Sequence, residues 1–393
     1  MKEKILTCES EKIADKAKKL FSRYDQDSDF QFLYDNVSSF FGDALRDDMK
    51  LYNEGKFYDI SLAAKWCPSL DSSYDKSLLM CESVARKVFP REEYVEYEDV
   101  EDAHYAYRVR DRLRKEVLVP LHKALDIPEV YICANKWGEL PYKHVPSVVM
   151  TLYRKLFYKN DKERFEQYVS DVKEGKTTIA AGALLPHETI ASLNDPTGTA
   201  VAEVQWERMV SDLAKKGKLT NCMAICDVSG SMDGTRMEVS VALGLLISEL
   251  SDEPWKGKLI TFSADPEFHV VKGKNLSEKT NFIRRMEWVV IFDKILEVAV
   301  KGKLSEEQMI KRLFVFSDME FDQASRTPWE TDYQVIQKKF KKKGYNKVPE
   351  IVFWDLRNSE ATPVPSNQQG VALVSGFSKN LVTFLGGRWS FES

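Results

Sequence analysis

Residues 224–232, Ala-Ile-Cys-Asp-Val-Ser-Gly-Ser-Met, decide the fold of the second half of the chain. The apolar run 222–226 that leads into them is typical of a buried parallel strand, because it is apolar on both faces. Asp227 follows at the carboxyl end of this strand, where open α/β sheets place their ligand sites. Gly230 then lets the chain turn sharply. The stretch therefore predicts an α/β sheet with a ligand site at one edge.

Oxygen-bearing side chains follow this strand at alternate positions. Asp227, Ser229 and Ser231 bring one carboxylate and two hydroxyls to one short loop. A second apolar run, 313–317, ends at Asp318, which places another carboxylate at the end of a strand that we expect to neighbour the first. Oxygen ligands suit hard cations such as Mg²⁺ or Mn²⁺. The alternative is that Asp227 merely caps the helix that follows, since Asp and Ser are good N-cap residues.

Strand-like and helix-like segments alternate through the second half. Strands are expected at 222–228, 258–263, 269–271, 313–317, 350–354 and 371–374, with helices at 237–250, 277–288, 292–300, 329–342 and 378–385. Such alternation predicts a doubly wound parallel sheet with helices on both faces. We place this α/β domain at residues 199–393, because the turn-rich stretch 194–199 precedes it and a linking helix, 200–216, opens it.

The first half, residues 1–198, carries apolar residues at helical spacing. Helices are expected at 10–24, 29–51, 76–88, 100–125, 145–159 and 162–174, with a break or kink at Pro120. Stacked helical pairs are typical of an α-solenoid fragment, although no fixed sequence period is present. The expected fold class is thus a helical half followed by an α/β half.

Composition disfavours several classes of protein. The 393 residues are 43% hydrophobic and carry a net charge of −4, so the chain can bury a sizeable core and has no global basic signal for nucleic acid. The six cysteines form no CxxC pair and no zinc spacing, a pattern typical of an intracellular protein of the cytoplasm or nucleus. No His-x-x-x-His pair is present, which argues against a zinc hydrolase. No apolar run approaches the length of a membrane span, so no membrane partner is expected.

The motif Asp227-x-Ser229-x-Ser231 lies between an apolar strand and a long amphipathic helix. In this setting it resembles the von Willebrand factor A domain and its metal-ion-dependent adhesion site. The resemblance implies that these residues and Asp318 hold Mg²⁺ or Mn²⁺, and that a carboxylate of a protein partner completes the shell of the metal. It also implies a Thr from a second loop. That loop is expected near 288–292, which is apolar and short, so the site is incomplete by the family pattern, and Thr280 in the preceding helix is the nearest substitute.

Both halves together are similar to a plant family of unknown function that joins a helical-repeat region of TROVE type to a von Willebrand factor A domain. The matching stretches include 60–69, 104–116, 181–188 and 255–262. The resemblance implies a truncated or divergent member that lacks amino-terminal helices. The architecture is also similar to that of the Ro ribonucleoprotein autoantigens, in which a helical ring binds structured non-coding RNA and the A domain closes the ring.

A basic cluster with aromatic neighbours lies in the helix expected at 100–125. It comprises Arg108, Arg110, Arg112, Arg114 and Lys115, next to Tyr105 and Tyr107. Surfaces that combine aromatic and basic side chains suit unpaired RNA. The alternative is a solvated helix face whose charges pair with Asp111 and Glu116. The lysine-rich run 338–343 is interpreted as a helix end, where cations complement the helix dipole, with Phe340 in the core.

Three functions follow from these patterns. The first is a non-enzymatic intracellular binding or scaffold protein that uses a metal-ion-dependent adhesion-type site to engage a protein or ribonucleoprotein partner. The second is binding of structured non-coding RNA by the helical half, with a structural A domain. The third, a metal-dependent phosphatase, is disfavoured because Ser229 stands where the second acid is expected and no phosphate loop or catalytic triad stands out. We therefore expect neither catalytic residues nor a small-molecule substrate.

Overall fold

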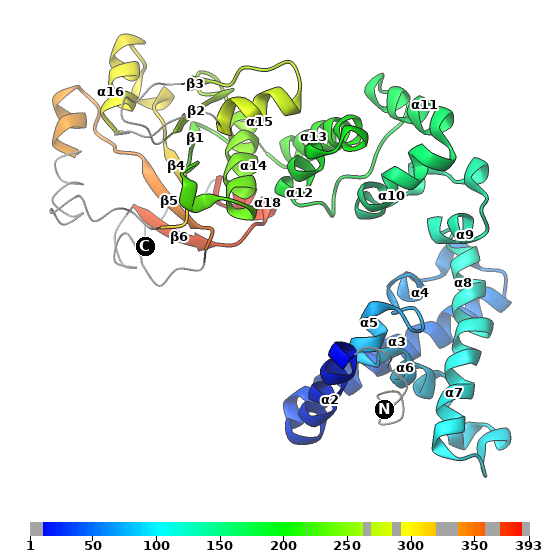
Figure 1. The fold of residues 1–393 in the computed structure, drawn as a ribbon. Helices are drawn as coiled ribbons and strands as arrows, with labels where there is room; N and C mark the ends of the chain where they lie inside the picture. The colour runs from blue at the N-terminus through cyan, green and yellow to red at the C-terminus, as the bar shows by residue number, and fades with distance from the viewer. Residues whose placement is uncertain are drawn as a thin grey trace. The chain divides into compact units, whose positions relative to one another are not determined.

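A computed structural model describes residues 11–217, 219–261, 269–284, 292–319, 337–357 and 370–386 (Figure 1). The chain forms two compact units, Met1–Leu140 and Pro141–Ser393. The first unit is helical and the second contains a sheet, so the expected fold class of a helical half followed by a doubly wound sheet is confirmed. The boundary predicted after residue 198 falls within α13 (Pro196–Lys216), in the second unit.

The first unit packs its helices around one apolar core. Its helices are α2 (Glu11–Gln26), α3 (Ser28–Asn53), α4 (Ala63–Trp66), α5 (Ser73–Leu78), α6 (Met80–Val88), α7 (Asp102–Arg112), the π-helical segment η4 (Leu113–Leu118), α8 (Val119–Ala124) and α9 (Pro128–Cys133). Leu45 of α3, Val84 of α6, Val109 of α7 and Leu121 of α8 are fully buried in this core. No helix in the described ranges is long and apolar enough to cross a membrane.

The helix expected at 76–88 is divided into α5 and α6 at Leu79. The φ angle of Leu79 is +54°, in the left-handed region, which interrupts the helical hydrogen bonds. The buried carboxylate of Asp75 accepts hydrogen bonds from the backbone N–H groups of Asp71 at 3.0 Å and Cys81 at 2.9 Å. These two bonds hold the break in place, and neither has a local sequence signature.

The helix expected at 100–125 continues past Pro120 without the predicted break. The π-helical segment η4 precedes the proline, and the N–H of Val119 bonds to the carbonyl of Arg114 in the wider turn. Proline lacks an N–H and its ring clashes with the preceding turn of an α-helix. The wider turn accommodates both effects, so the chain passes from α7 into α8 through η4.

The second unit opens with helices and continues into the sheet. Besides α13, its elements are α10 (Ser147–Asn160), α11 (Lys162–Lys173), α12 (Pro186–Ala191), β1 (Cys222–Cys226), α14 (Thr235–Leu250), β2 (Lys258–Thr261), β3 (His269–Val270), α15 (Leu276–Arg284), α16 (Phe292–Lys301), β4 (Arg312–Ser317), β5 (Glu350–Asp355), β6 (Val371–Ser375) and α18 (Lys379–Gly386). The strand order is β3-β2-β1-β4-β5-β6. All pairs are parallel except β2 with β3, whose seven-residue connection is too short for a crossover.

Alternate residues of the central strands enter two cores, one on each face of the sheet. On β1, Ala224 and Cys226 pack in the core that contains α14, and Met223 and Ile225 pack in the core that contains α16. The central strands are therefore buried on both faces, which explains their continuous apolar runs. Trp206 of α13 lies in the α14 core, so this helix packs with the sheet.

The fit of α14 against β1 depends on Gly244. A Cβ atom at this position would lie 2.0 Å from Cys226 Sγ. We expect Gly244→Ala to lower the free energy of unfolding by about 1–3 kcal/mol, because overpacking a dense core outweighs the better helix propensity of alanine. Urea unfolding followed by circular dichroism measures this change.

Two further variants test the cause. Gly138→Ala is the matched control, because no atom lies within 4 Å of its added Cβ. Cys226→Ala removes the sulfur that Gly244→Ala would meet, so the double variant should recover much of the lost stability. A double variant no more stable than Gly244→Ala alone would show that the clash is not the cause.

Candidate metal centre at the carboxyl edge of the sheet

The pairing of β1 with β4 brings two acidic residues together. Cys226 lies opposite Phe316 in the parallel register, and the N–H of Asp227 donates to the Phe316 carbonyl at 2.9 Å. Asp227 and Asp318 therefore follow the carboxyl ends of two neighbouring strands, at the same edge of the sheet. Each is only 1% exposed. The sheet thus presents two buried carboxylates at one place.

The loop after β1 folds around Asp227. The N–H of Ser229 donates to Asp227 Oδ1 at 3.0 Å, a turn in which an Asp side chain replaces a backbone acceptor. Residues 230–232 form a 3₁₀ turn, and Met232 at its end is buried in the α14 core. The turn leaves the Oγ atoms of Ser229 and Ser231 within 3.0 Å of each other. Both predicted hydroxyls therefore lie on the loop that begins at Asp227.

Ser317 is a third hydroxyl at this edge, and the sequence analysis missed it. Its Oγ donates to Asp227 Oδ2 at 2.8 Å and accepts from the N–H of Met319 at 3.2 Å. The side chain is buried at the end of β4. The available signal was a single hydroxyl that ends an apolar run immediately before Asp318. Because both of its hydrogen bonds are made within the protein, Ser317 orients the Asp227 carboxylate.

The surroundings of Asp227 disfavour its charged form. Burial raises the pKa of the Asp227 carboxyl above its ordinary value, and the neighbouring charge of Asp318 raises this pKa further. The hydrogen bonds from Ser229 and Ser317 oppose the rise. A cation beside the two carboxylates would relieve both the burial penalty and their mutual repulsion.

The oxygen atoms at this edge fit a small, hard cation. Two carboxylates and two hydroxyls are the ligand type that Mg²⁺ and Mn²⁺ prefer. The hydroxyls of Ser229 and Ser231 are hydrogen-bonded to each other at 3.0 Å, and octahedral ligands about 2.1 Å from Mg²⁺ have a similar separation of about 3.0 Å. In the described ranges no group of three or more His, Cys, Asp or Glu side chains could hold a metal.

Thr280 lies in the helix where the sequence placed it. It belongs to α15, is buried, and donates its hydroxyl to the carbonyl of Ser277 at 3.0 Å. That hydroxyl is therefore bonded to its own helix. Residues 288–291 of the expected short second loop lie outside the described residues, and residue 292 begins α16.

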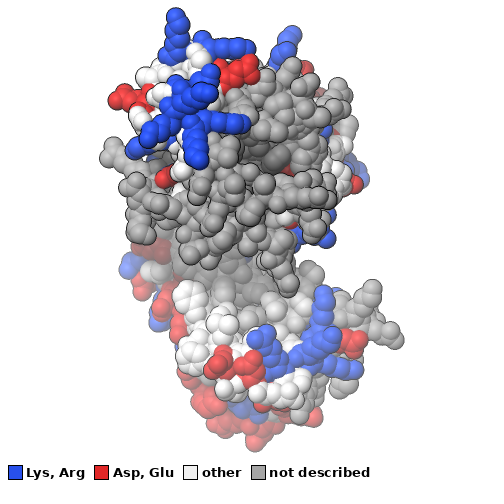
Figure 2. All heavy atoms as spheres, turned by 90° about the vertical axis from the view of Figure 1, so that its left-hand side faces the viewer, with Lys and Arg blue, Asp and Glu red and all other residues white. Residues whose placement is uncertain are grey.

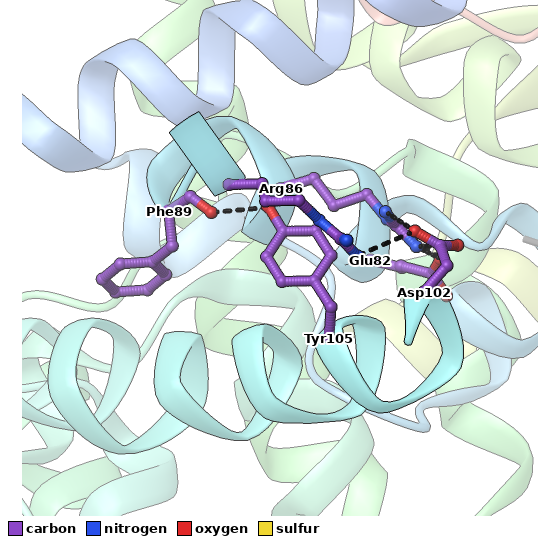
Figure 3. Close-up of polar contacts among 6 residues, drawn as sticks. Glu82, Arg86, Phe89, Asp102 and Tyr105 are labelled. Carbon is purple, nitrogen blue, oxygen red and sulfur yellow. Dashed lines mark hydrogen bonds and ion pairs between the residues drawn. The ribbon is translucent and has the colours of Figure 1, made fainter. Parts of the chain in front are cut away.

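The predicted RNA-binding cluster lies on α7 and η4, and its member Tyr105 is part of the core. Tyr105 is 3% exposed and donates its hydroxyl to the Phe89 carbonyl at 2.7 Å (Figure 3). The guanidinium of Arg86 lies over the Tyr105 ring, 5.0 Å from its centroid, and bonds to Asp102. Tyr105 is therefore covered, whereas Tyr107 is 68% exposed and can present a ring to solvent.

The basic side chains of this cluster all have partners on the protein. The contacts are Arg110–Asp71, Arg112–Glu96, Arg112–Glu116, Arg114–Asp111, Lys115–Asp111 and a hydrogen bond from Arg108 to the Glu96 carbonyl. Arg108 also stacks on Tyr97, and Arg112 stacks on Phe89. Four of the cationic side chains thus pair with four carboxylates, and Arg108 bonds to a backbone carbonyl. The pairs with Asp111 and Glu116 are those that the alternative interpretation predicted. RNA binding by this cluster stays a prediction.

Comparisons with known proteins group the chain with others of unknown function. Residues 2–219, more than half of the chain, match a family described as a domain of unknown function (DUF2828). The chain belongs to the DUF2828 family. Residues 221–392 of this DUF2828 member match a second family, described as a domain of unknown function (DUF7788).

The DUF2828 chain is also similar to two individual proteins. It is 29% identical over 368 residues to the uncharacterized protein L728 of Acanthamoeba polyphaga mimivirus, an alignment that covers 87% of this chain and 61% of the viral protein. The chain thus spans less than two thirds of the length of that relative. It is similar to the crystal structure of the Deinococcus radiodurans RO (RSR) protein with a TM-score of 0.43 and 14% identity, over 87% of this chain and 75% of that chain. At this TM-score the likeness carries no conclusion about ligands.

The raised pKa of Asp227 predicts how the stability of the metal-free DUF2828 chain depends on pH. A carboxyl whose pKa is higher in the folded state contributes stability at low pH and loses that contribution as the pH rises through the folded-state pKa. In the presence of a chelator, the free energy of unfolding should therefore fall relative to that of Asp227→Asn as the pH rises from about 4 to about 7. The Asn variant keeps the shape of the side chain and lacks its charge.

Chemical unfolding in EDTA at a series of pH values measures this difference. Asp212→Asn is a control of opposite sign. Although burial opposes the change, the contacts with Arg208 and Lys215 lower the pKa of Asp212, so the stability that this carboxylate contributes is lost as the pH falls. If the stability of Asp227→Asn runs parallel to that of the unsubstituted chain across this range, Asp227 does not titrate as its surroundings predict.

Proposed function

We propose that this chain is a non-enzymatic binding protein that engages a carboxylate of a protein or ribonucleoprotein partner through a divalent cation. Asp227, Ser229, Ser231 and Asp318 would hold Mg²⁺ or Mn²⁺ at the carboxyl edge of the sheet. The bound ion supplies a hard positive charge with a free coordination position, which suits an Asp or Glu side chain from outside. The observation that supports this most is that two buried carboxylates follow neighbouring strands at one edge of the sheet, and that the loop after the first carries two hydroxyls hydrogen-bonded to each other at 3.0 Å.

The contacts of Asp227 support binding more than covalent catalysis. One of its carboxylate oxygens accepts from the N–H of Ser229 and the other from Ser317 Oγ, so the group is held in one orientation. An aspartyl phosphatase would carry a second acid two residues after its nucleophile, and Ser229 occupies that position. The arrangement therefore suits a fixed ligand set.

Metal binding is tested first with the metal alone. A ligand that binds only the folded state raises the free energy of unfolding by RT ln(1 + [L]/Kd), which is about 2.7 kcal/mol when its concentration is one hundred times Kd. We expect saturating Mg²⁺ or Mn²⁺ to raise the Tm of the unsubstituted chain and to leave the Tm of Asp227→Ala unchanged. Differential scanning calorimetry in metal and in chelator measures both.

The control for this experiment is Asp212→Ala, which removes an acid from α13 and should keep the full response to metal. A response that persists in Asp227→Ala would place the bound ion elsewhere. Metal-dependent hydrolysis of a phosphate ester that disappears in Asp227→Ala would contradict a non-enzymatic role.

RNA binding is the second candidate function, and a surface of the sheet half favours it. Lys338, Lys339, Lys341, Lys342 and Lys343 are all exposed, while Phe340 among them is 1% exposed. Figure 2 shows a group of Lys and Arg side chains in the upper part of the face that it draws. Among the described residues, no salt bridge involves Lys341, Lys342 or Lys343, in contrast to the paired arginines of α7. Such lysines can contact phosphate groups without breaking an internal ion pair.

Charge reversal locates any RNA contact. We expect Lys341→Glu, Lys342→Glu and Lys343→Glu together to weaken binding of a labelled stem-loop RNA by about ten-fold or more. The slope of log affinity against log salt concentration should fall by about two to three, because each lost phosphate contact releases about one counterion fewer. Filter binding over a range of salt concentrations measures both quantities.

The matched control reverses two charges of the helical cluster, Arg114→Glu and Lys115→Glu, whose side chains are half exposed and share Asp111. Loss of binding in this variant alone would place the RNA on the helical half. Affinity that ignores salt and both sets of changes would rule out a phosphate-directed function.

A further inference from the structure

Arg236 lies beside the two carboxylates of the candidate metal centre. It belongs to the first turn of α14, and its Nη1 atom is 3.9 Å from Asp318 Oδ2. The side chain of Arg236 is 30% exposed, whereas that of Asp318 is 1% exposed. The guanidinium therefore lies between a buried carboxylate and the solvent.

The first turn of α14 does not itself favour a cation. The N-terminal end of a helix carries the positive end of the helix dipole and free N–H groups, so acids are favoured there and cations are disfavoured. The nearby Arg284 of α15 is paired with Glu238 of α14. In the described ranges the one ion pair of Arg236 is with Asp318. The acidic pair, rather than the helix, accounts for the position of the guanidinium.

Charge balance gives this contact a physical reason. Asp227 and Asp318 are both buried, and no salt bridge within the described ranges reaches Asp227. Two carboxylates close together in a poorly solvated place need a nearby positive charge. A guanidinium keeps its proton at any ordinary pH, so Arg236 supplies that charge permanently. The same charge repels a second cation that enters the site.

We propose that Arg236 is an internal counter-ion of Asp227 and Asp318 that competes with the divalent ion and so sets the concentration at which the site fills. This inference rests on the proposed metal-dependent function and deepens it. For the site to fill, the guanidinium must move towards solvent, and its partial exposure leaves room for that movement. The chain therefore binds divalent ions more weakly than the same oxygen ligands would without Arg236.

Substitution of Arg236 tests the competition directly. Arg236→Gln removes the charge and keeps a long polar side chain. We expect the midpoint of a titration with Mg²⁺ or Mn²⁺ alone, followed by calorimetry and by Tm, to move to about ten-fold lower concentration. Arg236→Lys keeps the charge and should stay near the unsubstituted chain. Arg208→Gln is the matched control, because it removes one positive charge from α13 while Asp212 keeps Lys215 as a partner.

The outcomes separate this inference from the proposed function. If the unsubstituted chain binds metal and Arg236→Gln binds it no more tightly, the counter-ion role is overturned and the metal function stands. If only Arg236→Gln binds metal, the counter-ion role is supported and the native chain does not use the metal at ordinary concentrations. If neither chain binds metal, both proposals fail. An equal shift in Arg208→Gln would reduce the effect to net charge and overturn the specific role of Arg236.

Discussion

The parallel register between β1 and β4 is the constraint on which the second unit depends. With Ala224 opposite Phe314 and Cys226 opposite Phe316, matching residues of the two strands enter the same core. A slip of one residue would exchange the sets that face α14 and α16, because side chains alternate along a strand. The same slip would break the bond from the Asp227 N–H to the Phe316 carbonyl and separate the two carboxylates. The register between β1 and β4 thus determines both the packing of the two cores and the geometry of the candidate site.

This register buries two carboxylates at the candidate site, which lowers the stability of the fold. A buried carboxylate without a matched cation destabilises the fold. Ser229 and Ser317 offset part of that cost by hydrogen bonds to Asp227, and Arg236 offsets part of it by charge. A protein tolerates such a loss of stability where the buried group binds a ligand, which is the usual trade between stability and function. In the metal-free fold, these short-range contacts therefore stabilise the two buried carboxylates in part.

Much of this arrangement could be predicted from the sequence. A strand buried on both faces is a continuous apolar run in the sequence, and the acidic residue that follows the run marks the end of the strand. Asp227 and Asp318 were found in this way. Tyr105 was misplaced because helical spacing says which side chains share a face, but not that residues 89–97 fold back to supply Phe89, Tyr94 and Glu96 against α7. The π-helical segment that precedes Pro120 likewise depends on the surrounding structure, and local propensity could not predict it.

The position of α13 bears on how this chain is inherited. Trp206 and Met209 belong to the DUF2828 segment, yet they are buried in the same core as Ala224 and Phe316 of the DUF7788 segment. A recombination between residues 219 and 221 would divide one apolar core between two gene products, and each would expose the part that the other used to cover. The two segments are therefore expected to have passed through evolution together, as a single heritable unit.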